Sequence, residues 1–308
     1  MVYRILCIDG GGIRGVYALQ VLKMLQDEID TDLFKKIDCF AGTSTGSLII
    51  ASLNQGYQVQ DLLNFYTFLG RRVFLKNKKT ENGGAKYSNR FLKKMLKKFL
   101  PNNPTLFDIQ PHMIIPSCHL SNGDNGLWEP IIYDNYDRTK AKEYNLIDIT
   151  LRSSAAPLYF PSYQKHIDGG VFALNPSLVA LSRAIDEKGA GKELNDIRLL
   201  SIGNGINPAG INIDVDWGPK EWLEPYHKVA KHPLFSLLTE IGATIPEYPL
   251  TQILKNKTLR INGPLSVPIE IDDVGKIDLL KREAKALKIH NREKWESYKH
   301  WVRQNFIV

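Results

Sequence analysis

The sequence predicts an α/β fold: a three-layer α/β/α sandwich with a mostly parallel central sheet and a mainly helical C-terminal extension. Three observations lead to this prediction. Short apolar runs alternate with stretches of helical periodicity along the first two thirds of the chain. The first apolar run ends in a glycine-rich turn, and the second ends in a turn of the form G-x-S-x-G. A helical pattern follows each turn, which is the order of a parallel sheet with crossover helices.

Strands and helices are expected in alternation. The strand-like runs cover 2–8, 37–41, 112–120, 128–134, 163–167 and 197–203. The helical patterns cover 14–29, 46–56, 60–69, 88–99, 146–155 and 176–188. After residue 205 the pattern loosens to one or more helices within 220–243, a strand over 258–262 and an amphipathic helical stretch over 277–306. We therefore expect a core at 1–205 and an extension at 206–308 that packs on it as part of one structural unit.

The composition is that of a globular protein with a sizeable core, since 43% of the 308 residues are hydrophobic and 24% are charged. No apolar stretch approaches the ~20 residues that a membrane-spanning helix needs. Arg4 and Asp9 interrupt the first apolar run, which argues against a secretory signal. Cys7, Cys39 and Cys118 lie in strand-like runs and indicate buried, reduced thiols. We expect a cytoplasmic protein, with export without a cleaved signal left open.

The turn Gly42-Thr43-Ser44-Thr45-Gly46 lies between a buried strand and a helix, which is the context of a nucleophile elbow. Gly42 and Gly46 flank the serine because so tight a turn leaves no room for neighbouring side chains. The N-terminal N–H groups of the next helix, Thr45 included, point to where negative charge develops in acyl transfer. Ser44 is therefore the predicted nucleophile.

The glycine-rich turn Asp9-Gly10-Gly11-Gly12-Ile13-Arg14-Gly15 also fits the dinucleotide-binding pattern G-x-G-x-x-G. That interpretation lacks the acidic residue expected at the end of a second strand, and no Gly-Lys-Ser/Thr closes a phosphate loop. We interpret the turn as an oxyanion hole, to which Gly10, Gly11 and Gly12 contribute N–H groups. For Arg14 two roles stay open: a solvent-facing side chain, or one that anchors a phosphate head group or stiffens the loop.

A third motif, Asp168-Gly169-Gly170, follows a predicted strand and by itself is typical of an ordinary turn. In this order, however, the three motifs resemble the signature of patatin-like phospholipases. Ser153-Ser154-Ala155-Ala156-Pro157 with Tyr159-Phe160-Pro161 is similar to the segment before the family's aspartate, and Leu199-Leu200-Ser201-Ile202-Gly203-Asn204-Gly205 resembles the strand and turn after it. The resemblance covers roughly the first 205 residues.

The resemblance implies a catalytic dyad of Ser44 and Asp168. It implies supporting roles for the remaining motif residues, namely Asp9, Arg14, Gly15, Gly42, Gly46, Gly169 and Gly170. It further implies a calcium-independent lipid acyl hydrolase of the phospholipase A or lysophospholipase type, which needs no cofactor and binds a phospholipid membrane surface transiently. Asp214 with Asp216, and Asp272 with Asp273, could suggest calcium, but they lack the spacing of an EF-hand. No recognised module points to a nucleic-acid partner.

Two alternatives remain beside the dyad. One is a Ser-His-Asp triad of the α/β-hydrolase type, whose histidine would have to be His227, His232, His290 or His300. His166 does not fit that role because it precedes Asp168 in the chain, and we expect it to point to the other face of its strand. The other is an effector with little basal activity that is switched on by an activating partner or small ligand. Region 206–308 would most easily accommodate such a partner or a second copy of the chain.

Positive charge is unevenly spread in this chain, which has 40 basic and 33 acidic residues. It concentrates between residues 71 and 98, in Lys76-Asn77-Lys78-Lys79 and in the lysine pairs of 93–98. Apolar residues interleave with the second group at helical spacing: Phe91, Leu92, Met95, Leu96, Phe99 and Leu100. The favoured interpretation is a surface helix with its apolar face on the core; the alternative is an element whose apolar face touches a bilayer. The glycine-rich stretch 82–84 is a candidate cap over the site.

Overall fold

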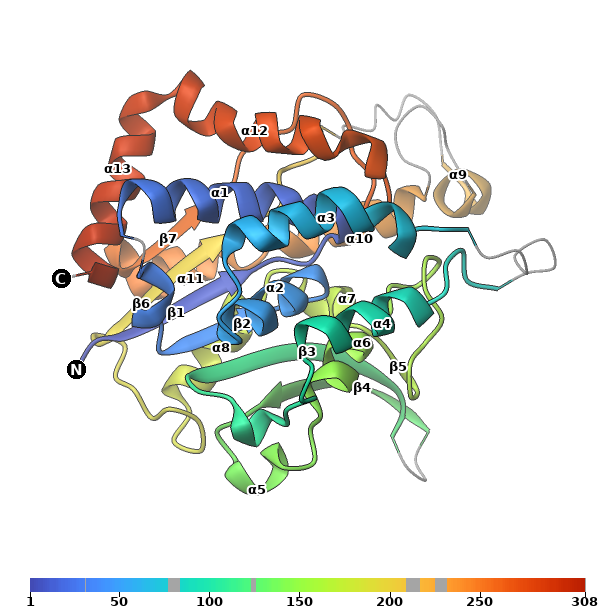
Figure 1. The fold of residues 1–308 in the computed structure, drawn as a ribbon, viewed down its shortest axis with the longest axis horizontal. Helices are drawn as coiled ribbons and strands as arrows, with labels where there is room; N and C mark the ends of the chain where they lie inside the picture. The colour runs from blue at the N-terminus through green and yellow to red at the C-terminus, as the bar shows by residue number, and fades with distance from the viewer. Residues whose placement is uncertain (31, 77–83, 123–125, 209–216, 225–231, 308) are drawn as a thin grey trace.

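A seven-stranded sheet forms the centre of the computed structural model, which describes all residues except 31, 77–83, 123–125, 209–216, 225–231 and 308 (Figure 1). The strand order is β4-β3-β2-β1-β6-β7, and β5 pairs with β3. The strands are β1 (Tyr3–Ile8), β2 (Cys39–Gly42), β3 (His112–Asn122), β4 (Leu127–Asp134), β5 (His166–Asp168), β6 (Ile197–Ile202) and β7 (Thr258–Ile261). The pairs among β3, β2, β1, β6 and β7 are parallel, whereas β4 and β5 run antiparallel to β3. The predicted α/β fold with a mostly parallel sheet is confirmed.

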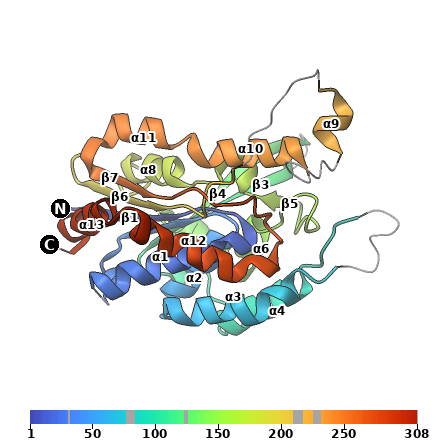
Figure 2. The ribbon, with the colours of Figure 1, turned by 90° about the horizontal axis from the view of Figure 1, so that it is seen from above.

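Helices cover both faces of this sheet (Figure 2). On one face lie α8, α10 and α11, and on the other lie α1, α2, α3, α4 and α12. The helices are α1 (Gly15–Glu28), α2 (Thr45–Asn54), α3 (Val59–Val73), α4 (Arg90–Phe99), α5 (Arg138–Ala141), α6 (Leu146–Ser153), α7 (Gly170–Ala173), α8 (Ser177–Ile185), α9 (Pro219–Leu223), α10 (Pro233–Thr244), α11 (Glu247–Leu254), α12 (Ile277–His290) and α13 (Arg292–Val302). Because β1 is covered on both sides, its run of apolar residues is almost completely buried.

Residues beyond 205 take part in the same core. The strand expected over 258–262 is β7, which extends the sheet by pairing in parallel with β6. The amphipathic stretch expected over 277–306 forms α12 and α13, and α12 packs along α1. Trp295 and Phe306 are completely buried in the main hydrophobic cluster. The C-terminal third therefore supplies both a strand and core side chains.

The lysine-rich helix α4 turns its apolar face inward. Leu92, Met95, Leu96 and Phe99 are buried, while the lysines of its last turn are exposed. The interpretation that these apolar side chains touch a bilayer is therefore wrong, and the surface-helix interpretation is correct. The candidate cap at 82–84 falls largely outside the described residues. None of the helices in the described ranges is both long enough and apolar enough to cross a membrane.

Candidate active site

The fold brings two distant strand ends together on one edge of β3. Ala41 at the end of β2 pairs with Ile114, and Asp168 at the end of β5 pairs with Ser117. Since β2 runs parallel to β3 and β5 runs antiparallel to it, the C-terminal ends of β2 and β5 face each other. The turn after β2 and Asp168 thus become neighbours, although Ser44 and Asp168 are 124 residues apart in the chain.

Ser44 occupies a strained backbone conformation at the start of α2, with φ 54° and ψ −121°. Its neighbours fix the turn, because its N–H donates to Ser153 Oγ at 2.9 Å and the N–H of Thr43 donates to Ile8 O at 3.3 Å. Gly46 passes so close to β1 that a Cβ there would lie 2.2 Å from Ile8 O. The flanking glycine is therefore required by a close approach of two backbones, as expected of a nucleophile elbow.

The hydroxyl of Ser44 donates directly to the carboxylate of Asp168, with 2.5 Å between Oγ and Oδ2. The other carboxylate oxygen accepts the N–H of Gly170 at 2.7 Å. Both side chains are buried, Ser44 being 7% and Asp168 5% exposed. Burial raises the pKa of Asp168 to about 7, against the two hydrogen bonds, which favour the charged form. A carboxylate with this pKa can accept and return a proton near neutral pH.

The glycine loop after β1 offers two N–H groups close to Ser44. Within the described residues, the N–H groups of Gly11, Gly12 and Thr45 donate to no protein acceptor. Gly12 has φ +57°, and a Cβ there would lie 2.3 Å from a backbone carbonyl oxygen. The expectation for Gly10 needs correction, because its N–H already donates to Leu174 O at 2.9 Å. In the described glycine loop and elbow, the N–H groups that remain without a protein acceptor and line a cavity with Ser44 are thus those of residues 11, 12 and 45.

Arg14 is buried, with 4% of its surface exposed, so it is not solvent-facing. Its guanidinium forms an ion pair with Glu240 on α10 and donates to Gly205 O at 2.9 Å and Asn204 O at 3.3 Å. These acceptors engage the guanidinium, while Arg14 also lines the second cavity beside Ser44, so the role of head-group anchor stays a prediction. Of the roles left open by the sequence, stiffening of the glycine loop agrees with these contacts.

Asp9, the first residue of the same loop, is held by an arginine that the sequence analysis did not find. Arg260 on β7 donates to both carboxylate oxygens of Asp9, at 3.1 and 2.6 Å. It also donates to Ser201 Oγ at 2.7 Å and to Glu247 Oε1 at 2.8 Å. Asp9 and Arg260 are 251 residues apart, and no local pattern marks their pairing. Asn204 is a second missed residue, since its side-chain amide donates to the carbonyl oxygens of Asp9 and Gly10.

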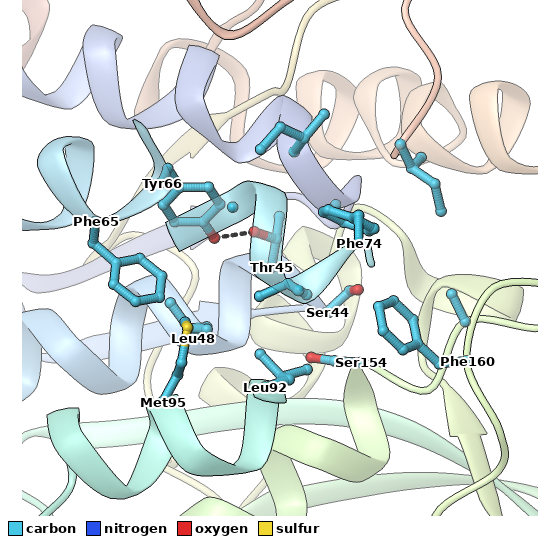
Figure 3. A pocket seen from close by; sticks show the side chains of 16 residues that line it. Ser44, Thr45, Leu48, Phe65, Tyr66, Phe74, Leu92, Met95, Ser154 and Phe160 are labelled. Carbon is cyan, nitrogen blue, oxygen red and sulfur yellow. Dashed lines mark hydrogen bonds between the residues drawn. The ribbon is translucent and has the colours of Figure 1, made fainter. Parts of the chain in front are cut away.

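Two cavities meet at Ser44. The first lies under α3 and α4 and is almost entirely apolar; Figure 3 shows the Ser44 hydroxyl beside it among aromatic and aliphatic side chains. These include Leu48, Phe65, Tyr66, Val73, Phe74, Leu92, Met95 and Phe160. The second lies toward α7 and α10, and Asp168 and Gly11 line it. Ser44, Gly12, Ala156 and Ile271 belong to the walls of both cavities. Ser44 thus borders both the apolar cavity and the second cavity, which Asp168 also lines.

None of the histidines that the structure describes contacts Ser44 or Asp168. His166 lies two residues before Asp168 on β5, so the two side chains share a face of the strand and the expectation that they point to opposite faces is wrong. The His166 ring is nevertheless engaged elsewhere, because its Nε2 pairs with Tyr133 OH at 2.8 Å, and burial lowers its pKa to about 4. His232 lies at the start of α10, while His290 and His300 are exposed. His227 falls outside the described residues.

Of the paired aspartates considered for calcium, only Asp272 and Asp273 lie in the described ranges. Asp272 accepts the hydroxyl of Tyr87 at 2.6 Å and pairs with Lys86, which gives this carboxylate a structural role. Asp214 and Asp216 lie outside the described ranges. Elsewhere in those ranges, no group of three or more His, Cys, Asp or Glu side chains could hold a metal ion.

Comparison with known proteins agrees with this geometry. The family model described as "Patatin-like phospholipase" matches residues 6–181, which include the glycine loop, the elbow and Asp168. Protein teg of Priestia megaterium is 27% identical over 259 residues, covering 82% of this chain and 80% of that protein. Patatin-like protein 2 of Arabidopsis thaliana is 25% identical over 301 residues, covering 82% and 72%. An intracellular phospholipase A2 of Caenorhabditis elegans is 32% identical over 222 residues, covering 67% of this chain but 20% of the worm protein. The chain belongs to the patatin-like phospholipase family.

Proposed function

We propose that this protein hydrolyses the acyl ester bonds of phospholipids, as a phospholipase A or lysophospholipase, with Ser44 as nucleophile and Asp168 as its base. The observation behind this proposal is the direct hydrogen bond from Ser44 Oγ to Asp168 Oδ2 at 2.5 Å. In a triad a histidine would stand between the hydroxyl and the acid. Direct contact leaves no room for it and favours the dyad.

The proposed reaction has two halves. Asp168 accepts the Ser44 hydroxyl proton as Oγ attacks the acyl carbonyl carbon, and the oxyanion is held by the N–H groups of Gly11, Gly12 and Thr45. As the carbon–oxygen ester bond breaks, Asp168 gives that proton to the departing alcohol, and the acyl group remains on Ser44. Water then attacks the acyl-serine while Asp168 accepts its proton. The fatty acid leaves, and Asp168 returns the proton to Oγ.

The first cavity supports a lipid acyl chain as the group transferred. Its wall is aliphatic and aromatic, and it includes Leu92 and Met95 from α4 and Phe65 from α3 (Figure 3). Each methylene removed from water contributes about 0.8 kcal/mol, so a long acyl chain gains strongly from such a wall. The second cavity, on the Asp168 side, is then available to the leaving alcohol. The name of the worm relative, an intracellular phospholipase A2, points to the same class of reaction.

The test is fatty-acid release from mixed phospholipid vesicles with a chelator present, for wild type, Ser44→Ala and the control Ser52→Ala. Ser52 lies on α2, which begins just after Ser44, and is also buried, but its hydroxyl donates to Leu48 O at 2.8 Å, within that helix. We expect release by wild type and Ser52→Ala and none by Ser44→Ala. Equal release by wild type and Ser44→Ala would exclude the elbow as the active site. A serine-directed fluorophosphonate that labels the protein only after a partner or ligand is added would favour the switched effector instead.

A further inference from the structure

Exposed apolar side chains adjoin the residues that line both cavities. At the end of α3, Phe74 lines the first cavity, and the next residue, Leu75, is 64% exposed. In the loop after α6, Phe160 lines the same cavity and Leu158 is 51% exposed. Two segments that form the wall of the acyl cavity therefore each turn a leucine into solvent.

The second cavity has the same arrangement. Val171 on α7 lines it and is 44% exposed, and its neighbour Phe172 is 41% exposed. On α10, Phe235 lines the cavity while Leu234 is 37% exposed. Leu75, Leu158, Val171, Phe172 and Leu234 are called the apolar rim below. The final turn of α3 and the end of α10 nearest α9 lie at the same end of the molecule in both views (Figures 1 and 2).

The side chain of Leu158 is exposed, and its backbone conformation is strained. Its φ is +73°, a conformation that costs a residue with a Cβ on the order of 1 kcal/mol. Backbone hydrogen bonds at Leu158 and at the next residue fix it there, because the N–H of Lys86 donates to Leu158 O at 3.3 Å and the N–H of Tyr87 donates to Tyr159 O at 2.7 Å. A strained, exposed leucine two residues from a cavity wall is better explained by a binding role than by packing.

Cations accompany the rim on the α3 side. Arg71 and Arg72, in the last turn of α3, and Lys76 just after it are all exposed. In the part of the chain that the structure describes, no carboxylate pairs with any of the three. Apolar side chains flanked by available cations match a surface of anionic phospholipid, in which head-group phosphates lie just above acyl chains.

We propose that the apolar rim docks on a phospholipid bilayer that contains anionic lipid. Leu75 and Leu158 enter the boundary between head groups and acyl chains, while Arg71, Arg72 and Lys76 contact the phosphates. The cavities then open into the bilayer, so an acyl chain reaches Ser44 without crossing water. The docking proposal rests on the proposed function, which assigns the cavities to lipid. A protein partner could also cover apolar side chains, but exposed cations, close in the chain to residues that line the acyl cavity, favour lipid.

The test measures sedimentation with vesicles in the Ser44→Ala background, so that no hydrolysis alters the lipid. The vesicles are phosphatidylcholine alone and an equal mixture of phosphatidylcholine and phosphatidylserine. The pair Leu75→Asn and Leu158→Asn should weaken partitioning about tenfold or more on both. The pair Arg71→Gln and Arg72→Gln should weaken it about tenfold on the mixed vesicles and little on phosphatidylcholine. Asparagine suits the left-handed backbone at residue 158, and circular dichroism with the thermal midpoint checks the fold.

The matched control is Ile289→Asn, which replaces an equally exposed aliphatic side chain, 73% exposed, at the end of α12 next to α13 (Figure 1). Its partitioning should equal that of the parent. Absence of vesicle binding by the parent protein, unchanged binding by the Leu75 and Leu158 pair, or an equal loss in Ile289→Asn would overturn the proposal. Because binding is measured without turnover, its result is independent of whether the active chain releases fatty acid.

Discussion

Replacing Asp168 by asparagine should make the protein more stable while abolishing its proposed activity. The change keeps the shape of the side chain. An amide oxygen can still accept the Gly170 N–H, which lies 2.7 Å from Asp168 Oδ1, and the amide nitrogen can donate to Ser44 Oγ. What disappears is the ionisable group, whose charged form burial disfavours.

The magnitude follows from the pKa. Burial raises the pKa of Asp168 from 3.8 to about 7, and at about 1.36 kcal/mol per pKa unit this corresponds to about 4 kcal/mol. The folded state holds the proton more tightly than the unfolded state does. The stability that protonation contributes is therefore fully present below pH 3.8 and is lost as the pH rises to about 7. Asp168→Asn has no group that titrates here and does not lose this stability. Its free energy of unfolding relative to wild type therefore increases with pH.

Urea unfolding of both proteins between pH 5 and pH 7.5 measures this difference. The free energy of unfolding of Asp168→Asn, relative to wild type, should increase by about 2.5 kcal/mol over that range. Asp278→Asn is the control, because the side chain of Asp278 is 84% exposed and its removal should give no such trend. A difference that stays constant with pH would refute the reasoning that burial has raised the pKa of Asp168.

Three further predictions concern the site. First, kcat/KM for a soluble ester should rise about tenfold per pH unit up to about pH 7, since Asp168 must be unprotonated to act as base; a flat profile from pH 5 would exclude that role. Second, Gly12→Ala should lower ester hydrolysis about 100-fold, because its Cβ would lie 2.3 Å from a carbonyl oxygen and would displace the loop that carries the proposed oxyanion donors. The control Gly84→Ala, with φ +115° but open space around it, should retain activity. Third, Glu240→Ala leaves the buried guanidinium of Arg14 without its carboxylate and should lower the free energy of unfolding, measured in urea, by about 3 kcal/mol. The double variant Arg14→Met with Glu240→Leu should regain much of that loss, because no charge is then left buried. An equal loss in the double variant would contradict this.

Local signals were enough to predict most of the sheet and the elbow. The residues around Ser44 lie within one strand, one turn and one helix, so spacing alone indicates their arrangement. The periodicity of α4 predicted an apolar face but left open what covers it, because core and bilayer select the same side chains. The partners of Asp9 and Arg14 could not be predicted, since they depend on how β7 and α10 pack against distant segments.

The same limit applies to Gly10. Its sequence context is the same as that of Gly11 and Gly12, yet its N–H is taken by Leu174, a residue that reaches the loop only through the packing of α7. Which N–H groups of a glycine-rich turn remain free is decided by tertiary contacts. The pattern therefore predicts the kind of site, and the packing selects the donors.

The ion pair between Asp9 and Arg260 affects when the site can assemble during synthesis on the ribosome. The glycine loop and the nucleophile elbow emerge early, but the cation that neutralises Asp9 arrives 251 residues later, on β7. Until then, closing the sheet would bury a lone carboxylate, which costs several kcal/mol. We expect the nascent chain to lack an assembled dyad until β7 has left the exit tunnel. If the proposed function is correct, the order of synthesis then delays ester hydrolysis until β7 has been made.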